Sequence, residues 1–241
     1  ARIAKEIHPD VPIIFGGLSS SYFHEELIQY PCVDYVLRGN ATEPPLYELL
    51  TCLADGRSPE DVPNLTWSAS GQIHSNPITY LPNTLDEADL APERMMRMVL
   101  RHRDLRSVLP FDGWWKNPIT AVFTAKGCAH ECVTCGSSKE AASLVVHCKK
   151  PIFRSPQNLV KNRFAISRFS KGPIFLVGDL QQGGEEYAAE VLALLKEAKI
   201  KNEIVFELFG MPPLSFLMQI DEAVLNWSLE LSPESHDESV R

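Results

Sequence analysis

Apolar residues follow two alternating patterns along the first part of the chain, short continuous runs and longer runs with helical spacing. The runs at 11–15 and 33–37 are each followed by glycine, and apolar residues at 23–28 and 46–53 come after them at helical spacing. A short buried run that ends at a turn predicts a strand, and the helical period predicts an amphipathic helix. Residues 1–55 therefore predict β-α-β-α units of an α/β sheet, preceded by a helical stretch at 3–7.

The same alternation returns after residue 118. Strands are predicted at 119–124, 174–177, 204–208 and 227–231, and helices at 155–166, 185–198 and 214–225. Four strands with helices between them predict a parallel sheet, either doubly wound or part of a barrel. A complete eight-stranded barrel takes about 250 residues, so this segment corresponds to about half of one. Because the chain begins at Ala1 inside a helical pattern, and 235–241 look like the start of another helix, we expect a fragment.

A connecting segment separates these two regions. A small hairpin is predicted at 64–74 around Ser70 and Gly71, and residues 75–95 carry three prolines and several acidic residues, as linkers do. We therefore expect three parts: residues 1–55, a connecting segment at 56–117, and residues 118–241.

Composition narrows the class of protein. The chain is 44% apolar and 22% charged, which is typical of a folded protein, and its formal net charge is −8. An acidic chain without a basic stripe argues against a nucleic-acid partner. No run approaches the roughly 18 apolar residues of a membrane span, and no signal peptide begins the chain. We expect a cytoplasmic protein with no membrane partner.

Three of the six cysteines lie within eight residues and indicate a metal site. Cys128, Cys132 and Cys135 have the spacing C-x3-C-x2-C. Thiolates are the usual ligands of iron–sulfur clusters, and three of them leave one iron of a four-iron cluster for another ligand. The alternatives are a zinc site with Cys148 as fourth ligand, or a non-catalytic electron-transfer protein.

This spacing, on the loop after the first strand of the predicted barrel, resembles the radical S-adenosylmethionine (SAM) superfamily. The resemblance implies that Cys128, Cys132 and Cys135 hold a [4Fe-4S] cluster. Its fourth iron would chelate SAM, which is cleaved reductively to a 5′-deoxyadenosyl radical. It also implies a small-molecule substrate and an electron donor such as flavodoxin or ferredoxin. One departure is Thr134, where the family often has an aromatic residue.

The same resemblance indicates SAM contacts on later strands. Gly178 and Asp179 end the second barrel strand, where such proteins place a turn that contacts the methionine amino group. Glu207 and Glu230, on the next two strands, are further candidates for the ribose or sulfonium, or else are rim carboxylates. Residues 183–185 have the letters of the family's GGE motif but fall five residues late, so we expect a helix start there.

The N-terminal part resembles the second half of a cobalamin-binding domain fused ahead of radical SAM barrels. The resemblance rests on Gly16 and Gly17 after a strand, and on the segment 33–43, which contains Gly39. Asn40 and Thr42 depart from the family pattern. The resemblance implies the C-terminal part of a doubly wound, Rossmann-like domain, followed by the first half of a partial TIM-type barrel. A corrinoid bound at Gly16, Gly17 and Gly39 would carry a methyl group to an unactivated centre.

Overall fold

The computed structural model describes residues 1–87, 91–104, 112–116, 118–168 and 170–232, and the predicted helix start at 235–241 lies outside them. The chain divides into two compact units. Unit 1 comprises Ala1–Ala88 and Lys126–Ile152, and unit 2 comprises Asp89–Ala125 and Phe153–Arg241. These units differ from the three consecutive parts expected from the sequence, because the cysteine segment belongs with the N-terminal residues.

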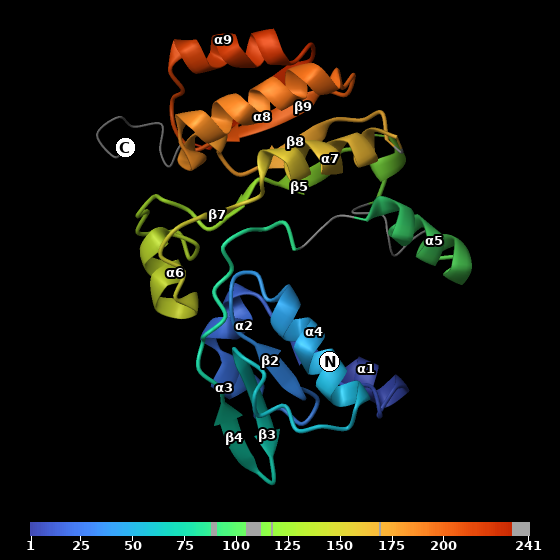
Figure 1. The fold of residues 1–241 in the computed structure, drawn as a ribbon. Helices are drawn as coiled ribbons and strands as arrows, with labels where there is room; N and C mark the ends of the chain where they lie inside the picture. Colours follow the sequence, from blue (N-terminus) through green and yellow to red (C-terminus); the bar gives the residue numbers. More distant parts are fainter. Residues whose placement is uncertain (88–90, 105–111, 117, 169, 233–241) are drawn as a thin grey trace. The chain divides into compact units, whose positions relative to one another are not determined.

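Unit 1 is built on a mixed four-stranded sheet (Figure 1). Its strands, in spatial order, are β1 (Ile14–Phe15), β2 (Tyr35–Leu37), β3 (Leu65–Ala69) and β4 (Gln72–Ser75). β1 and β2 are parallel, whereas β2–β3 and β3–β4 are antiparallel. Residues 1–55 also form four helices, which are α1 (Arg2–Ile7), α2 (Leu18–Tyr22), α3 (His24–Leu27) and α4 (Glu43–Ala54). The predicted elements of residues 1–55 are confirmed, and the hairpin belongs to this sheet rather than to a separate connecting segment.

Both faces of β2 are buried, which explains why its sequence is a continuous apolar run. Val36 packs with Ile28 and Val33 in one cluster. The next residue, Leu37, packs in a second cluster with Leu49 of α4 and Leu65 of β3. Since successive strand residues point to opposite faces, the two clusters lie on the two sides of the sheet.

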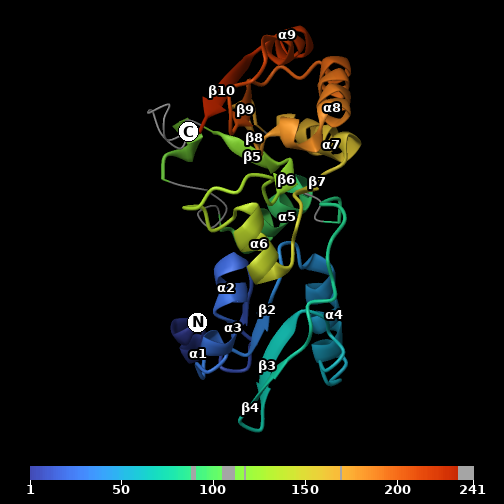
Figure 2. The ribbon, with the colours of Figure 1, turned by 90° about the vertical axis from the view of Figure 1, so that its left-hand side faces the viewer.

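Unit 2 is built on a four-stranded sheet in which every neighbouring pair is parallel. The spatial order is β10 (Trp227–Leu231), β9 (Ile204–Leu208), β8 (Ile174–Val177) and β5 (Thr120–Phe123). The helices α7 (Pro156–Ser167), α8 (Glu185–Ala198) and α9 (Leu214–Ala223) cover one face of it (Figure 2). The predicted β/α alternation of this region is confirmed.

Burial alternates along the strands of unit 2. Ile204, Phe206 and Leu208 of β9 are at most 1% exposed and belong to the core under the helices. Val205 and Glu207, between them, are only half-buried. Val205 and Glu207 therefore lie on the face of the sheet opposite the helices.

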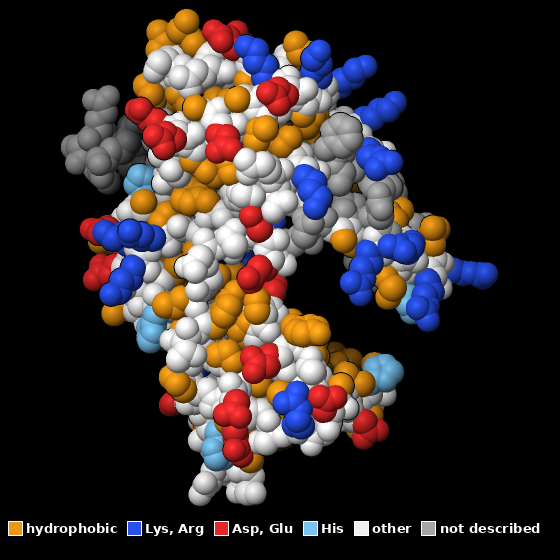
Figure 3. Space-filling model, viewed as in Figure 1, with side chains coloured by type: hydrophobic (Ala, Val, Ile, Leu, Met, Phe, Trp, Pro, Cys, Tyr) orange, Lys and Arg blue, Asp and Glu red, His pale blue; other side chains and the backbone are white. Residues whose placement is uncertain are grey.

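Several elements escaped the sequence analysis. The segment expected as a linker contains α5 (Pro92–His102), a further helix α6 (Lys139–Val146) follows the cysteines, and β6 (Ala125–Lys126) pairs with β7 (Ile152–Phe153). Short 3-10 turns occur at Trp114–Lys116 and Leu180–Gly183. Arg94, Arg97 and Arg101 recur at helical spacing on α5, and Figure 3 shows Lys and Arg side chains gathered there. Within the described ranges, no helix has the length and apolar character of a membrane span.

Candidate functional site

The three clustered cysteines lie on the loop between β6 and α6. Cys128 and Cys132 are half-buried, and Cys135 is exposed. The loop turns tightly at the last two, because the Cys135 amide donates to the Cys132 carbonyl at 3.2 Å and the Ser138 amide donates to the Cys135 carbonyl at 3.1 Å. Ser138 then caps α6, since its Oγ accepts from the Ala141 amide at 3.3 Å. Helix α6 therefore begins four residues after the third cysteine.

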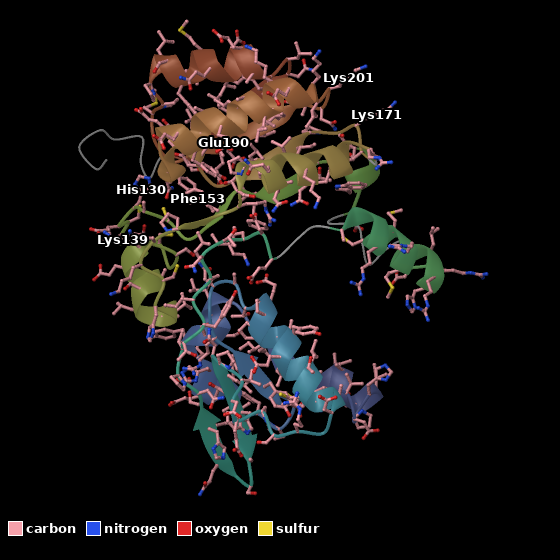
Figure 4. All side chains as sticks on the ribbon, in the orientation of Figure 1. His130, Lys139, Phe153, Lys171, Glu190 and Lys201 are labelled. Atoms are coloured by element: carbon pink, nitrogen blue, oxygen red, sulfur yellow. The ribbon has the colours of Figure 1, made fainter. Side chains whose placement is uncertain are left out.

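Backbone and charged groups surround the first two cysteines. The His130 amide donates to Cys128 Sγ at 3.4 Å, and the His130 carbonyl accepts from the Lys139 amide at 2.9 Å. Lys139 Nζ lies 2.7 Å from Glu131 Oε1, and this hydrogen bond lowers the pKa of Glu131 and raises the pKa of Lys139. Figure 4 shows Lys139 and His130 on this part of the molecule. The loop therefore presents an N–H group to a cysteine sulfur, an interaction that tunes iron–sulfur clusters.

The donor set fits an iron–sulfur cluster. The six cysteines, all of them among the described residues, form no disulfide. Across the part of the chain that the structure describes, no three His, Cys, Asp or Glu side chains are placed close enough together to hold a metal ion. The three thiols thus share one loop without converging on one point. Metal binding is commonly coupled to folding of the segment that carries the ligands, so thiols on one loop can form a metal site without being preformed around it.

Cys148 is engaged elsewhere. Its Sγ donates to the Lys150 carbonyl at 3.1 Å and accepts from Asn40 Nδ2 at 3.8 Å. It also packs against the buried cluster of Ala41, Leu85 and Ile152. This packing speaks against the alternative in which Cys148 completes a four-cysteine site.

The second candidate region is the carboxyl edge of the unit 2 sheet. Gly178 follows β8 with φ +103°, and its amide donates to Glu207 Oε2 at 2.6 Å. The fully buried Thr124 donates its hydroxyl toward the carbonyls of Val177 and Gly178, each at 2.9 Å. A Cβ at position 178 would lie 2.7 Å from that hydroxyl, so the turn requires glycine.

Asp179 acts as a brace within this edge. It is 5% exposed, its Oδ1 accepts from the Gln181 amide at 2.9 Å, and its Oδ2 accepts from the Phe209 amide at 3.1 Å. Both carboxylate oxygens therefore already have backbone partners. These two hydrogen bonds give Asp179 a structural role, and its direct contact with SAM stays a prediction.

Glu207 remains the candidate for ligand contact at this edge. It pairs in register with Glu230 on β10, so both carboxylates lie on the face opposite the helices. Burial raises the pKa of Glu207, the Gly178 hydrogen bond opposes that rise, and the nearby Glu230 and Asp179 charges add to it. With one half-buried and one exposed carboxylate, this edge is negative and attracts a cation. The GGE letters take no part, because Gly184 caps α8 and Glu185 begins it, as expected.

The N-terminal glycines form a third region, at the carboxyl edge of β1 and β2. Ser21 Oγ donates to the Gly17 carbonyl at 2.9 Å and accepts from the Gly39 amide at 3.0 Å, so the structure brings these two glycines together. Ser21 was missed because nothing distinguishes it from the two serines before it. A Cβ at Gly16 would make an ordinary 3.8 Å contact with the Leu37 carbonyl.

The two linked glycines differ in what surrounds them. A Cβ at Gly17 (φ +94°) would meet nothing within 4 Å, whereas one at Gly39 (φ +145°) would lie 2.6 Å from Thr42 Cγ2. Gly17 therefore offers open backbone that a large ligand can approach. Gly39 is needed for local packing.

A cavity of about 570 Å³ lies elsewhere, lined by Lys171, Lys201, Glu203, Leu225, Asn226 and Trp227 (Figure 4). These residues precede or begin the strands of unit 2, so the cavity lies at the amino edge of the sheet. In open α/β sheets and in barrels, ligands bind at the carboxyl edge. The cavity is therefore separate from the Gly178 and Glu207 edge.

Comparison with known proteins gives relatives of the same fold. No family model matches the chain. An uncharacterized methyltransferase of Pyrococcus horikoshii, PH0819, is 28% identical over 141 residues, which cover 57% of this chain and 28% of the relative. A solved structure of the radical SAM methyltransferase TsrM of Kitasatospora setae, with cobalamin and a [4Fe-4S] cluster, matches with a TM-score of 0.66 at 16% identity over 96% of this chain.

Two further solved structures have a similar fold. TsrM with tryptophan and a SAM analogue matches with a TM-score of 0.67 at 15% identity over 99% of this chain, and the cobalamin-dependent SAM radical enzyme OxsB matches with 0.61 at 14% over 99%. The chain covers 43%, 44% and 33% of these three structures, so it spans less than half of each relative. At these identities the likeness shows that the α/β fold is shared.

Proposed function

We propose that this chain forms the corrinoid-side sheet and the cluster-binding loop of a cobalamin-dependent radical SAM methyltransferase. The observation that carries the proposal is the C-x3-C-x2-C loop, which follows the first strand of a four-stranded parallel sheet. The fold likeness to TsrM and OxsB over nearly the whole chain supports it. The 28% identity to a methyltransferase supports it independently.

Each cofactor has its own residues in this proposal. Cys128, Cys132 and Cys135 hold a [4Fe-4S] cluster, which supplies an electron for the reductive cleavage of SAM when both are bound. The His130 amide stabilises negative charge on the Cys128 sulfur, which lies 3.4 Å away. Lys139 neutralises Glu131 beside the loop and so lowers the negative charge near three thiolates.

The carboxyl edge of unit 2 holds the cationic end of SAM. Glu207 is fixed by the Gly178 amide at 2.6 Å, and Glu230 stands beside it on the neighbouring strand. Glu207 is half-buried and Glu230 is exposed. Such a carboxylate pair favours an ammonium or sulfonium group, because partial desolvation of Glu207 strengthens its attraction to an opposite charge. Asp179 and Thr124 hold the turn in shape.

The carboxyl edge of unit 1 holds a corrinoid. Gly17 exposes backbone with open space where a side chain would lie, and Ser21 fixes it to Gly39. The proposal includes methyl transfer to a small-molecule substrate in the cytoplasm and a one-electron donor such as flavodoxin or ferredoxin. It includes neither a membrane nor a nucleic-acid partner.

The test is spectroscopic and uses a matched pair of cysteine variants. The chain is reconstituted anaerobically with iron and sulfide, reduced with dithionite, and examined by EPR with and without SAM, with 5′-deoxyadenosine measured alongside. We expect a [4Fe-4S] signal that shifts on adding SAM, is lost in Cys128→Ala, and is retained in the control Cys148→Ala. A signal indifferent to SAM, or one that requires Cys148, would replace the proposal by a zinc or electron-transfer protein.

A further inference from the structure

The cysteine loop is closed at its base. A Cβ at Gly127, where the loop begins, would lie 3.3 Å from the Pro151 Cα and 3.7 Å from the Lys150 carbonyl, where it ends. Gly127 has φ +92°, which disfavours any other residue there. The pairing of β6 with β7 brings the same two ends together. The two ends of the loop formed by residues 127–151 therefore lie close together.

One side chain from the end of β2 reaches both ends of this loop. Asn40 Nδ2 lies 3.6 Å from the Cβ position of Gly127 and donates to Cys148 Sγ at 3.8 Å. Asn40 directly follows Gly39, whose amide is held by Ser21. The backbone beside Asn40 is thus held to the sheet region by Ser21, and its side-chain amide is hydrogen-bonded to the loop.

Apolar and charged contacts reinforce this attachment. Ala41 is 5% exposed and packs with Ile152 and Leu85, and Cys148 packs against the same cluster. Glu43 Oε1 lies 3.8 Å from Lys126 Nζ just before the loop begins. An ion pair this exposed adds little stability, so the amide and the apolar cluster carry most of the attachment.

A helix contact gives a second point of attachment. α2 packs against α6, the helix that follows the third cysteine, and both views show them side by side (Figures 1 and 2). α2 begins directly after Gly17. The segments that carry the candidate corrinoid residues Gly17 and Gly39 therefore also hold the loop, from two sides.

We infer that Asn40 is a positioning residue for the cysteine loop: it ties the Cys148 end of the loop to the strand end of β2 and lies beside the Gly127 end, with Glu43 as a minor support. The strand end of β2 in unit 1 then helps to set where the three thiols lie. The contacts are independent of the proposed function, but their consequence for a cluster rests on it.

The first experiment uses the metal-free chain, so that it does not depend on cluster binding. Amide hydrogen exchange of residues 127–138 and alkylation of Cys148 by iodoacetamide are measured in Asn40→Ala and in Asn83→Ala, a control at an exposed asparagine of the same unit. We expect both rates to rise about fivefold in Asn40→Ala, which corresponds to the loss of about one hydrogen bond, and to stay unchanged in Asn83→Ala. Equal rates in the two variants would overturn the inference.

Two additions keep the result interpretable. Asn40→Asp preserves size but removes the amide donor, so it replaces Asn40→Ala if that variant does not fold, and the same rise is expected. In reconstituted protein, the EPR lines of the Asn40 variant should broaden because the thiols sample more positions, and unchanged lines would overturn the role toward the cluster. If the metal-free rates respond while the parent chain binds no cluster, the inference stands and the proposed function fails.

Discussion

At the carboxyl edge of each of the two sheets, a side-chain hydroxyl bonds backbone groups at a glycine turn, but the charged side chains around the two turns differ. At the edge of unit 1, the Ser21 hydroxyl links Gly17 to Gly39. At the edge of unit 2, the Thr124 hydroxyl holds the carbonyls of Val177 and Gly178. In both places a short polar side chain satisfies backbone groups at a glycine turn, as buried peptide groups require.

What differs is the surrounding charge. The edge of unit 2 adds the carboxylates of Glu207 and Asp179 within hydrogen-bond distance of backbone amides, whereas a neutral hydroxyl links the two turns of unit 1. An open glycine turn that is held by a hydroxyl suits a large ligand that approaches backbone, and a carboxylate edge suits a small cation. Similar turn geometry therefore supports two ligand classes. The proposed corrinoid and SAM sites follow this division.

The largest expected effect comes from adding a Cβ at two glycine turns, of which one is crowded and one is open. Gly178→Ala must accept a left-handed φ and a 2.7 Å contact with the buried Thr124 hydroxyl, so we expect a loss of about 3 kcal/mol of folding stability. Gly17→Ala has the φ penalty but no clash, and should lose about 1 kcal/mol. Urea unfolding measures the total loss of stability, and hydrogen exchange resolved by segment shows in which of the two units the loss occurs. Equal losses would contradict the view that only the Gly17 turn is open.

A smaller effect tests the bracing role of Asp179. Asp179→Asn turns one acceptor into a donor that faces a backbone amide, so we expect a loss of about 2 kcal/mol in urea unfolding. Glu230→Gln, at a neighbouring exposed carboxylate, is the control and should change stability by less than about 0.5 kcal/mol. If Asp179→Asn kept full stability and lost only SAM affinity, Asp179 would be a ligand contact rather than a brace.

The smallest effect concerns pH and Glu207. Its pKa is raised in the folded state, mainly by burial, so folding stability associated with this group is fully present below its ordinary pKa and is lost as pH rises through the raised value. Glu207→Gln keeps an oxygen acceptor for the Gly178 amide and removes this loss. We expect the variant to gain stability relative to the parent from pH 4 to pH 8, as measured by urea unfolding. Parallel pH curves for the two proteins would show that the carboxylate is not desolvated.

The β/α region was predictable because its signals are local. The helical period of 185–198 and the apolar runs 204–208 and 227–231 match α8, β9 and β10 residue for residue. Ser155 also caps α7, through the Asn158 amide. Each of these elements buries one side against its neighbours, so its own sequence contains the pattern.

Only part of the candidate site was predictable from the sequence, because several of its contacts join segments that are far apart in the chain. The cysteine spacing is visible in the sequence, but the attachment of the loop to unit 1 depends on Asn40 and Cys148, which are 108 positions apart. The partners of Asp179 include Phe209, 30 positions away. Helix α5 was missed because Pro92 and the acidic residues before it resemble a linker. No periodicity or spacing reports a contact that forms only in the folded chain.

The attachment of the loop also orders events during synthesis of the protein. Ribosomes build the chain from its N-terminus, so the strand end that carries Asn40 emerges before the three clustered cysteines. Cys148 follows Asn40 by 108 positions, which takes roughly 5 to 20 s of translation. For the last part of that interval the cysteines are exposed on a loop whose far end has not yet been made. Under the proposed function, iron and sulfide delivered at that stage would meet thiols whose loop is not yet attached to unit 1, so we expect cluster insertion after Asn40 and Cys148 have met.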